Sequence, residues 1–140
     1  MPLRREFEIF DHTADVGVTA YGNDTAEAFA NAARGLFSLI ANLETIRELT
    51  CRETELAAPD QESLLVDWLN ELIYLFDVEQ LIFGRFEVEL LPGVRLKAKS
   101  YGERVDKNRH ILKTGVKAAT YHMVEIEEGG ECRVKVIFDI

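Results

Sequence analysis

Apolar and polar residues alternate with a period of two near the start of the chain, which is the pattern of a half-buried β-strand. The alternation covers residues 5–10 and resumes over residues 16–20. We expect two strands here, joined by a short connection at residues 11–14. Asp11 and Asp15 then stand at the two ends of this connection.

Two longer segments repeat their apolar residues at the spacing of an α-helix. The first follows the polar residues 23–25, whose side-chain oxygens can cap a helix, and its apolar stripe continues to Ile40. The second follows residues 59–60 and carries a wider stripe, which includes Trp68, as far as Phe76. Each stripe is the face that a helix buries against a sheet, and we interpret the aromatic residues of the second stripe as core.

Further extended segments fill most of the remaining chain. They are residues 48–56, 86–90, 94–98, 116–127 and 132–138. Pro92-Gly93 is a turn sequence and predicts a hairpin whose outer face pairs opposite charges across strands. Residues 102–115 have no clear period and are predicted to be a loop. The whole pattern predicts an α+β fold, with two helices packed on a mostly antiparallel sheet as a two-layer sandwich.

The composition predicts one globular domain over residues 1–140. The formal net charge is −9 and the pI is near 4.8, so any contact with RNA is local or made through a protein partner. Cys51 and Cys132 lack CxxC spacing and are interpreted as small core residues. The sequence shows no signal peptide or membrane span, which predicts a cytoplasmic protein that does not bind membranes.

Acidic groups lie close to both ends of the chain. Asp139 precedes the C-terminal Ile140 and its free carboxylate, while Asp11, His12 and Asp15 follow the first predicted strand. Period two places Asp139 on the outer face of its strand. If the fold joins the two ends, the result is an oxygen-rich site that suits Ca²⁺, Mg²⁺ or Mn²⁺ better than Zn²⁺. The alternative is that these aspartates cap a turn, face solvent or form a polar terminus, and spacing alone favours it.

Basic residues cluster in the segment before the last two predicted strands. They are Arg104, Lys107, Arg109, His110, Lys113 and Lys117. Such a segment either grips phosphate or an acidic partner surface, or is a solvated loop. His122 lies beyond it, where a histidine serves as an acid, base or ligand, or as a hydrogen-bonded structural residue. With no GxSxG motif, P-loop or glycine-rich dinucleotide turn, the sequence does not support a self-contained enzyme.

Five motifs follow one another from near the first residue to the last. They are Asp11-His12-Thr13-Ala14-Asp15-Val16-Gly17, Ala20-Tyr21-Gly22, Glu27-Ala28-Phe29 with Ala32-Ala33 and Leu36-Phe37, Lys117-Ala118-Ala119-Thr120-Tyr121-His122, and Val136-Ile137-Phe138-Asp139-Ile140. In this order and spacing the chain closely resembles the archease family. The first and last of these motifs are the most specific.

The resemblance implies a small acidic α+β protein that assists an RtcB-type RNA ligase, the enzyme that joins tRNA halves during splicing. It implies promotion of ligase guanylylation and of multiple turnover, so we expect a protein cofactor rather than an enzyme. It also implies contact with tRNA only through the ligase. The divalent-cation site of the family falls on Asp11, Asp139 and the Ile140 carboxylate, with Asp15 and His12 nearby and Ca²⁺ as the expected ion.

Within this interpretation, Lys113, Lys117 and His122 are the residues that we expect to bind the partner. Two alternatives from other functional classes stay open. The first alternative is a metal-dependent enzyme that acts alone. The second is a chaperone or modulator of tRNA-modifying enzymes. A general chaperone needs a broad exposed apolar patch, which the sequence does not predict.

Overall fold

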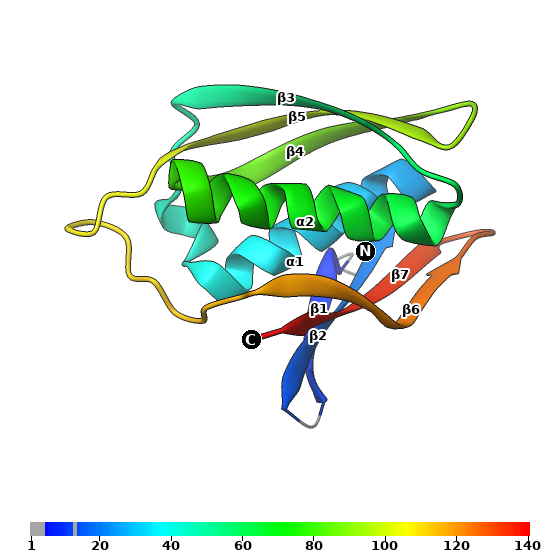
Figure 1. Ribbon diagram of the computed structural model, residues 1–140, viewed down its shortest axis with the longest axis horizontal. Helices are drawn as coiled ribbons and strands as arrows, with labels where there is room; N and C mark the ends of the chain where they lie inside the picture. Colours follow the sequence, from blue (N-terminus) through cyan, green and yellow to red (C-terminus); the bar gives the residue numbers. More distant parts are fainter. Residues whose placement is uncertain (1–4, 13) are drawn as a thin grey trace.

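The chain folds as two α-helices and seven β-strands within residues 5–12 and 14–140, the part that the computed structural model describes (Figure 1). The elements are β1 (Phe7–His12), β2 (Asp15–Gly22), α1 (Thr25–Ile40), the 3₁₀-helix η1 (Leu43–Thr45), β3 (Thr50–Ala57), α2 (Gln61–Glu79), β4 (Leu81–Leu91), β5 (Arg95–Arg104), β6 (Ala118–Glu127) and β7 (Cys132–Asp139). In this part of the chain, no helix is both long enough and apolar enough to cross a lipid bilayer.

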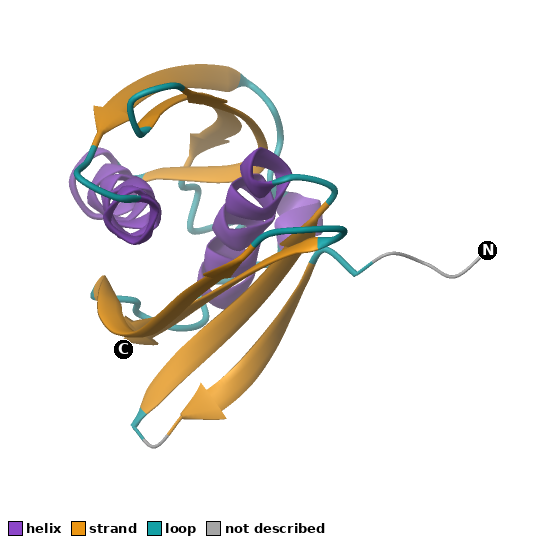
Figure 2. Ribbon diagram, turned by 90° about the vertical axis from the view of Figure 1, so that its right-hand side faces the viewer, coloured by secondary structure: helices purple, strands orange, loops and turns teal. Residues whose placement is uncertain are grey.

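The strands form two antiparallel sheets, one on each side of the helices. The larger sheet has the order β1-β2-β7-β6 and the smaller sheet the order β3-β5-β4. Helix α1 packs against β2 and β4, and α2 packs against β6 and the smaller sheet, so both helices lie between the sheets (Figure 2). The predicted α+β class, with two helices and antiparallel strands, is confirmed.

The division into two sheets refines the predicted two-layer arrangement into three layers. The residues that α2 buries lie on more than one side of the helix, and they are Leu64, Leu65, Val66, Trp68, Leu69, Leu72, Ile73 and Leu75. A helix with such a wide apolar surface needs cover from more than one direction. The smaller sheet supplies that cover on the side away from β6.

Each helix begins at an aspartate in the segment predicted to cap it. Asp24 accepts a hydrogen bond from the Glu27 N–H, and Asp60 accepts one from the Ser63 N–H, both at 2.8 Å. The Glu27 carboxylate in turn accepts from the N–H of Asn23, the residue before the cap, at 2.7 Å, an arrangement close to a capping box. These bonds fix the residues at which the two helices start.

The two helices meet in a core rich in aromatic rings. The Trp68 Nε1–H donates to the Phe29 carbonyl oxygen at 3.1 Å, which links α2 to α1 and satisfies the buried indole. The Trp68 ring lies edge-on to Phe86, Phe37 stacks on Phe86, and Phe37 and Phe83 meet edge to face. The prediction that the aromatic residues in the apolar stripe of the second helix belong to the core is confirmed, since Trp68 is completely buried and Phe76 packs against the core.

Candidate functional site

The register of the larger sheet brings Asp15, near the start of the chain, beside Asp139, near its end. Val16 in β2 lies opposite Phe138 in β7. Because the two strands are antiparallel, Asp15, just before Val16, lies beside Asp139, just after Phe138. On the other side of β7, Ala118 lies opposite Asp139. Asp15, Ala118 and Asp139 therefore meet at one end of the sheet.

The predicted acidic ligands do not all leave the sheet on the same face. Asp11 lies opposite Val16, which is buried, so its side chain starts from the inward face of β1. Asp15 and Asp139 are one residue further along and start from the outward face, as the period-two argument predicts for Asp139. The Asp11 carboxylate therefore has to reach round the exposed end of the sheet to join the other two.

Across residues 5–12 and 14–140, no group of three or more His, Cys, Asp or Glu side chains is placed to hold a metal ion. The His12 backbone lies opposite Asp15, but its side chain is outside the described part. The oxygen donors of Asp139, Asp15 and the C-terminal carboxylate have the chemistry that a hard cation prefers. The cation site stays a prediction.

Lys117 is joined directly to the acidic chain end. Its backbone N–H donates to the Asp139 carbonyl oxygen at 2.8 Å, and its side chain is exposed. Lys113 lies earlier in the same connection, where its N–H donates to the Ile40 carbonyl oxygen at the end of α1. Of the residues predicted to bind the partner, Lys117 is therefore beside the candidate site, and Lys113 is on the loop that leads to it.

His122 lies in a large bulge of β6. The register of β6 on β7 shifts between Thr120 and Glu125, so residues 121–124 oppose the single residue Val136. Met123 adopts a left-handed conformation with φ +57°, which L residues rarely occupy. Bulges of this kind redirect side chains and are common beside functional sites. His122 is exposed on this bulge rather than next to Asp139.

Sequence reasoning did not find this bulge, because it treated residues 116–127 as one extended segment. The available signal was that the apolar alternation fails after Ala119. On the bulge, the Tyr121 side chain is 58% exposed and that of Met123 is 46% exposed. The bulge therefore carries two large side chains outward at the free edge of the larger sheet.

Asn70 beside the edge strand β6 is another feature that the sequence did not predict. Its Oδ1 accepts from the Ala119 N–H at 2.8 Å, and its Nδ2 donates to the Ala119 carbonyl oxygen at 3.2 Å. Both groups belong to the outer edge of β6, which no other strand pairs among the described elements. Because Ala119 follows the partner of Asp139, Asn70 holds the edge strand that flanks the candidate site. The available signal was that Asn70 borders the apolar stripe, one turn from the buried Val66 and Ile73.

The predicted basic segment divides into buried and exposed residues. The Arg109 guanidinium and the His110 ring both contact Glu103, which is only 5% exposed. Burial by itself raises the pKa of Glu103, but hydrogen bonds from Arg109, the Arg47 N–H and His110 outweigh it and lower the pKa to about 2. The Arg109 guanidinium and the His110 ring are therefore engaged within the fold by Glu103 and, for Arg109, the Thr45 carbonyl oxygen.

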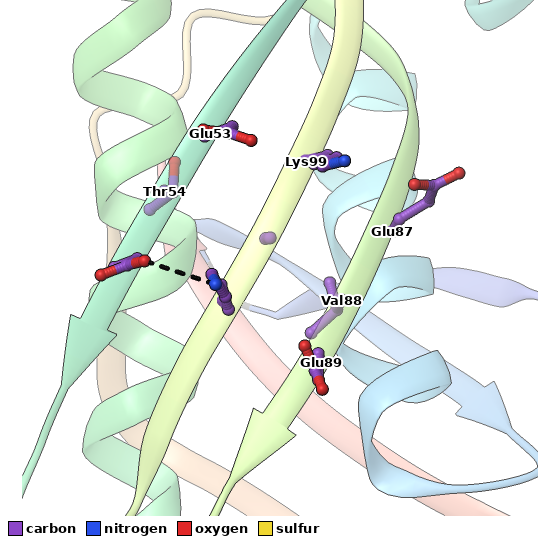
Figure 3. A pocket seen from close by; sticks show the side chains of 9 residues that line it. Glu53, Thr54, Glu87, Val88, Glu89 and Lys99 are labelled. Atoms are coloured by element: carbon purple, nitrogen blue, oxygen red, sulfur yellow. Dashed lines mark ion pairs between the residues drawn. The ribbon is translucent and has the colours of Figure 1, made fainter.

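A shallow hollow of about 410 Å³ lies on a different part of the molecule, over the smaller sheet (Figure 3). Its charged residues form cross-strand rows in which a lysine of β5 lies between glutamates of β3 and β4. In one row Lys97 lies 3.8 Å from Glu55. This is the pairing of opposite charges predicted for the outer face of the hairpin. The charged residues that line the hollow are therefore explained by pairing within the sheet.

Comparison with known proteins identifies relatives over almost the whole chain. Residues 7–140 match the model of the Archease protein family. A protein named archease from Methanosarcina mazei is 40% identical, with 97% of each chain covered, and one from Pyrococcus abyssi is 42% identical, with 89% of each covered.

Two solved structures share the fold. The solution structure of a Methanobacterium thermoautotrophicum protein is 37% identical and has a TM-score of 0.85, covering 96% of this chain and 99% of the other. The crystal structure of an archease from Thermotoga maritima, described as a possible chaperone, is 26% identical and has a TM-score of 0.64 over 100% and 99% of the two chains.

Proposed function

The chain belongs to the archease family, and on this premise we propose that it is an accessory protein of an RtcB-type RNA ligase in tRNA splicing. In this role it promotes guanylylation of the ligase, supports multiple turnover and works in the cytoplasm. It contacts tRNA only through the ligase. It is then a protein cofactor and not itself an enzyme.

The exposed acidic C-terminus is the observation that supports this proposal most directly. Asp139 and Ile140 are exposed, although Ile137 and Phe138 just before them are completely buried. The backbone of Asp139 pairs with β6 and accepts the Lys117 N–H. The last two residues therefore project from a fixed strand end. An acidic group held in this way suits insertion into the active centre of another protein.

We further propose that this end of the sheet holds a divalent cation. Asp139 and the Ile140 carboxylate are the central ligands and Asp11 is the third, while Asp15 and His12 are additional candidates. Oxygen ligands favour Ca²⁺, with Mg²⁺ and Mn²⁺ as substitutes. A cation there would offset the mutual repulsion of the carboxylates and present positive charge to an anionic group.

The rate of ligase guanylylation tests the proposal. The purified RtcB-type ligase of the same organism is incubated with GTP and tRNA halves, with and without this protein. We expect the protein to speed formation of the ligase–GMP adduct and to let each ligase join more than one tRNA. The proposal would be refuted if the protein neither speeds adduct formation nor lets each ligase join more than one tRNA. Joining or cleavage of RNA by this protein alone would favour the stand-alone enzyme.

A second candidate function has one specific observation in its favour, the description of the Thermotoga maritima relative as a possible chaperone. A chaperone suppresses the aggregation of unrelated unfolded proteins, and an activator of one ligase does not. Light scattering from a heat-denatured enzyme, recorded with and without this protein, separates the two functions.

A further inference from the structure

The connection between β5 and β6, residues 105–117, contains no helix or strand but is fastened at both ends. The Val105 N–H donates to the Gln80 carbonyl oxygen at 2.8 Å, and the Lys117 N–H donates to that of Asp139 at 2.8 Å. Between them, Lys113 and Thr114 donate to carbonyl oxygens at the end of α1, at 2.8 and 3.0 Å. This connection, yellow to orange in Figure 1, projects beyond the ends of the helices. Long ordered loops of this kind commonly carry function.

A buried histidine anchors the middle of the loop. The His110 side chain is completely buried, and its Nδ1 accepts from the Asp106 N–H at 2.9 Å. Its Nε2 therefore carries the proton and donates to Glu103, 3.0 Å away. The Asp106 carbonyl oxygen also accepts from the His110 N–H at 2.7 Å. Residues 106–110 thus form a closed turn that is tied to β5.

Two apolar side chains follow this anchor directly and face solvent. Ile111 is 80% exposed, the highest value for a large apolar residue in the described part of the chain, and Leu112 is 42% exposed. The next residue, Lys113, is fastened to α1. The apolar pair is therefore held between two fixed points. A pre-ordered apolar tip loses little conformational entropy when it binds.

Exposed lysines flank the apolar pair in the sequence. Lys107 precedes the anchor, while Lys113 and Lys117 follow the tip, and all three are exposed. This local positive charge stands out in a chain with a net charge of −9. An apolar tip with a basic rim is complementary to an apolar recess with an acidic rim, which is a feature of protein surfaces and not of RNA.

We propose that Ile111 and Leu112 form a docking tip, which inserts into an apolar, acidic-rimmed recess of the partner protein. This inference rests on the proposed function, because it takes the RtcB-type ligase as that partner. Lys117 links the docking tip to Asp139, so the loop that binds the partner also runs to the acidic end that acts on it. The docking tip supplies affinity, and the acidic end supplies activation.

Binding of the ligase to a variant of the docking tip tests this division of roles. The double variant Ile111→Ser/Leu112→Ser is compared with Leu49→Ser, which removes an apolar side chain that is 67% exposed outside the loop. We expect the Kd for the ligase, measured by titration calorimetry, to rise at least about tenfold in the double variant and to stay within about twofold in the control. At saturating concentration, the double variant should still reach full stimulation of guanylylation.

A second variant tests the basic rim. Lys107→Glu/Lys113→Glu should weaken binding and flatten its dependence on salt concentration. Wild-type affinity in both double variants would overturn the docking proposal and leave the proposed function intact. Failure of the wild-type protein to bind the ligase would overturn both.

Discussion

Lys117 donates its backbone N–H to the carbonyl oxygen of Asp139 at 2.8 Å, and this bond ties the start of β6 to the end of the chain. It comes one residue before the pairing of Ala118 with Asp139. A C-terminal residue is ordinarily free to fray. Here the backbone of Asp139, the last residue but one, is held on the β6 side, while its side chain stays exposed. The acidic end is thus ordered before any partner arrives.

Asn70 supports this arrangement from the other side of β6. Replacing Asn70 by Asp keeps the shape of the side chain but puts a second acceptor opposite the Ala119 carbonyl oxygen. We expect the free energy of unfolding in urea to fall by about 1–3 kcal/mol. The matched control is Asp67→Asn on the exposed part of the same helix, which should change it by less than about 0.5 kcal/mol. Equal stabilities of the two variants would contradict this role.

Glu103 makes the stability of the fold depend on pH in the acidic range. Its pKa is about 2 in the folded protein and 4.5 ordinarily, because the bonds from Arg109, Arg47 and His110 outweigh the effect of burial. The unfolded state therefore takes up the proton first as the pH falls. The stabilisation, about 3 kcal/mol, is fully present above pH 4.5 and is lost as the pH falls towards 2.

The variant Glu103→Gln isolates this contribution from those of other carboxylates. The difference in unfolding free energy between wild type and variant should be largest at pH 6 and should shrink steadily below pH 4.5. Urea titrations at several pH values measure it. A difference that does not change with pH would show that the Glu103 charge is not what stabilises the loop.

Met123 stores strain in the bulge of β6, because its φ of +57° is unfavourable for a residue with a Cβ atom. Replacing it by Gly should remove this cost and raise the free energy of unfolding by up to about 1 kcal/mol. The variant Met123→Ala also loses the methionine side chain beyond Cβ but keeps the strained backbone. Its free energy of unfolding should therefore not rise. A Gly variant no more stable than the Ala variant would argue against strain at this position.

The chain ends illustrate what the sequence was able to predict. Strict alternation on both sides of residues 11–14 predicted the hairpin of β1 and β2, and it is found at that place. Period two also placed Asp139 on the outward face. The same alternation puts Asp11 on the face of Phe7 and Ile9. This is the inward face, where Asp11 lies opposite Val16. Alternation assigns faces, and only the register shows which side chains meet.

Other features depend on contacts between distant segments and leave little trace in the local pattern. Alternation does not specify which strands pair, so the division into two sheets was not predicted. The basic segment was treated as one unit, because nothing in its composition distinguishes the half-buried Arg109 and the buried His110 from the exposed Lys113. Their partner Glu103 lies in β5, in what was expected to be the loop.

The proposed cation gives a prediction that does not need the ligase. Millimolar Ca²⁺ should raise the thermal unfolding midpoint of the wild-type protein, because an ion that binds only the folded state stabilises it. Asp139→Asn should abolish that rise, and the exposed Asp67→Asn should preserve it. Differential scanning calorimetry with Ca²⁺, Mg²⁺, Mn²⁺ and no added metal measures the effect. Equal shifts in both variants would mean that the ion binds elsewhere.

The stimulation of ligase guanylylation by Asp139→Asn tests the central claim most directly. The rate of ligase–GMP formation is measured at saturating concentrations of wild type, Asp139→Asn and the control Asp67→Asn, after all three are shown to be folded. We predict that wild type and Asp67→Asn stimulate equally. The stimulation by Asp139→Asn should be at least about tenfold smaller than that by wild type. Full stimulation by Asp139→Asn would contradict the account, because the acidic chain end would then have no part in activation.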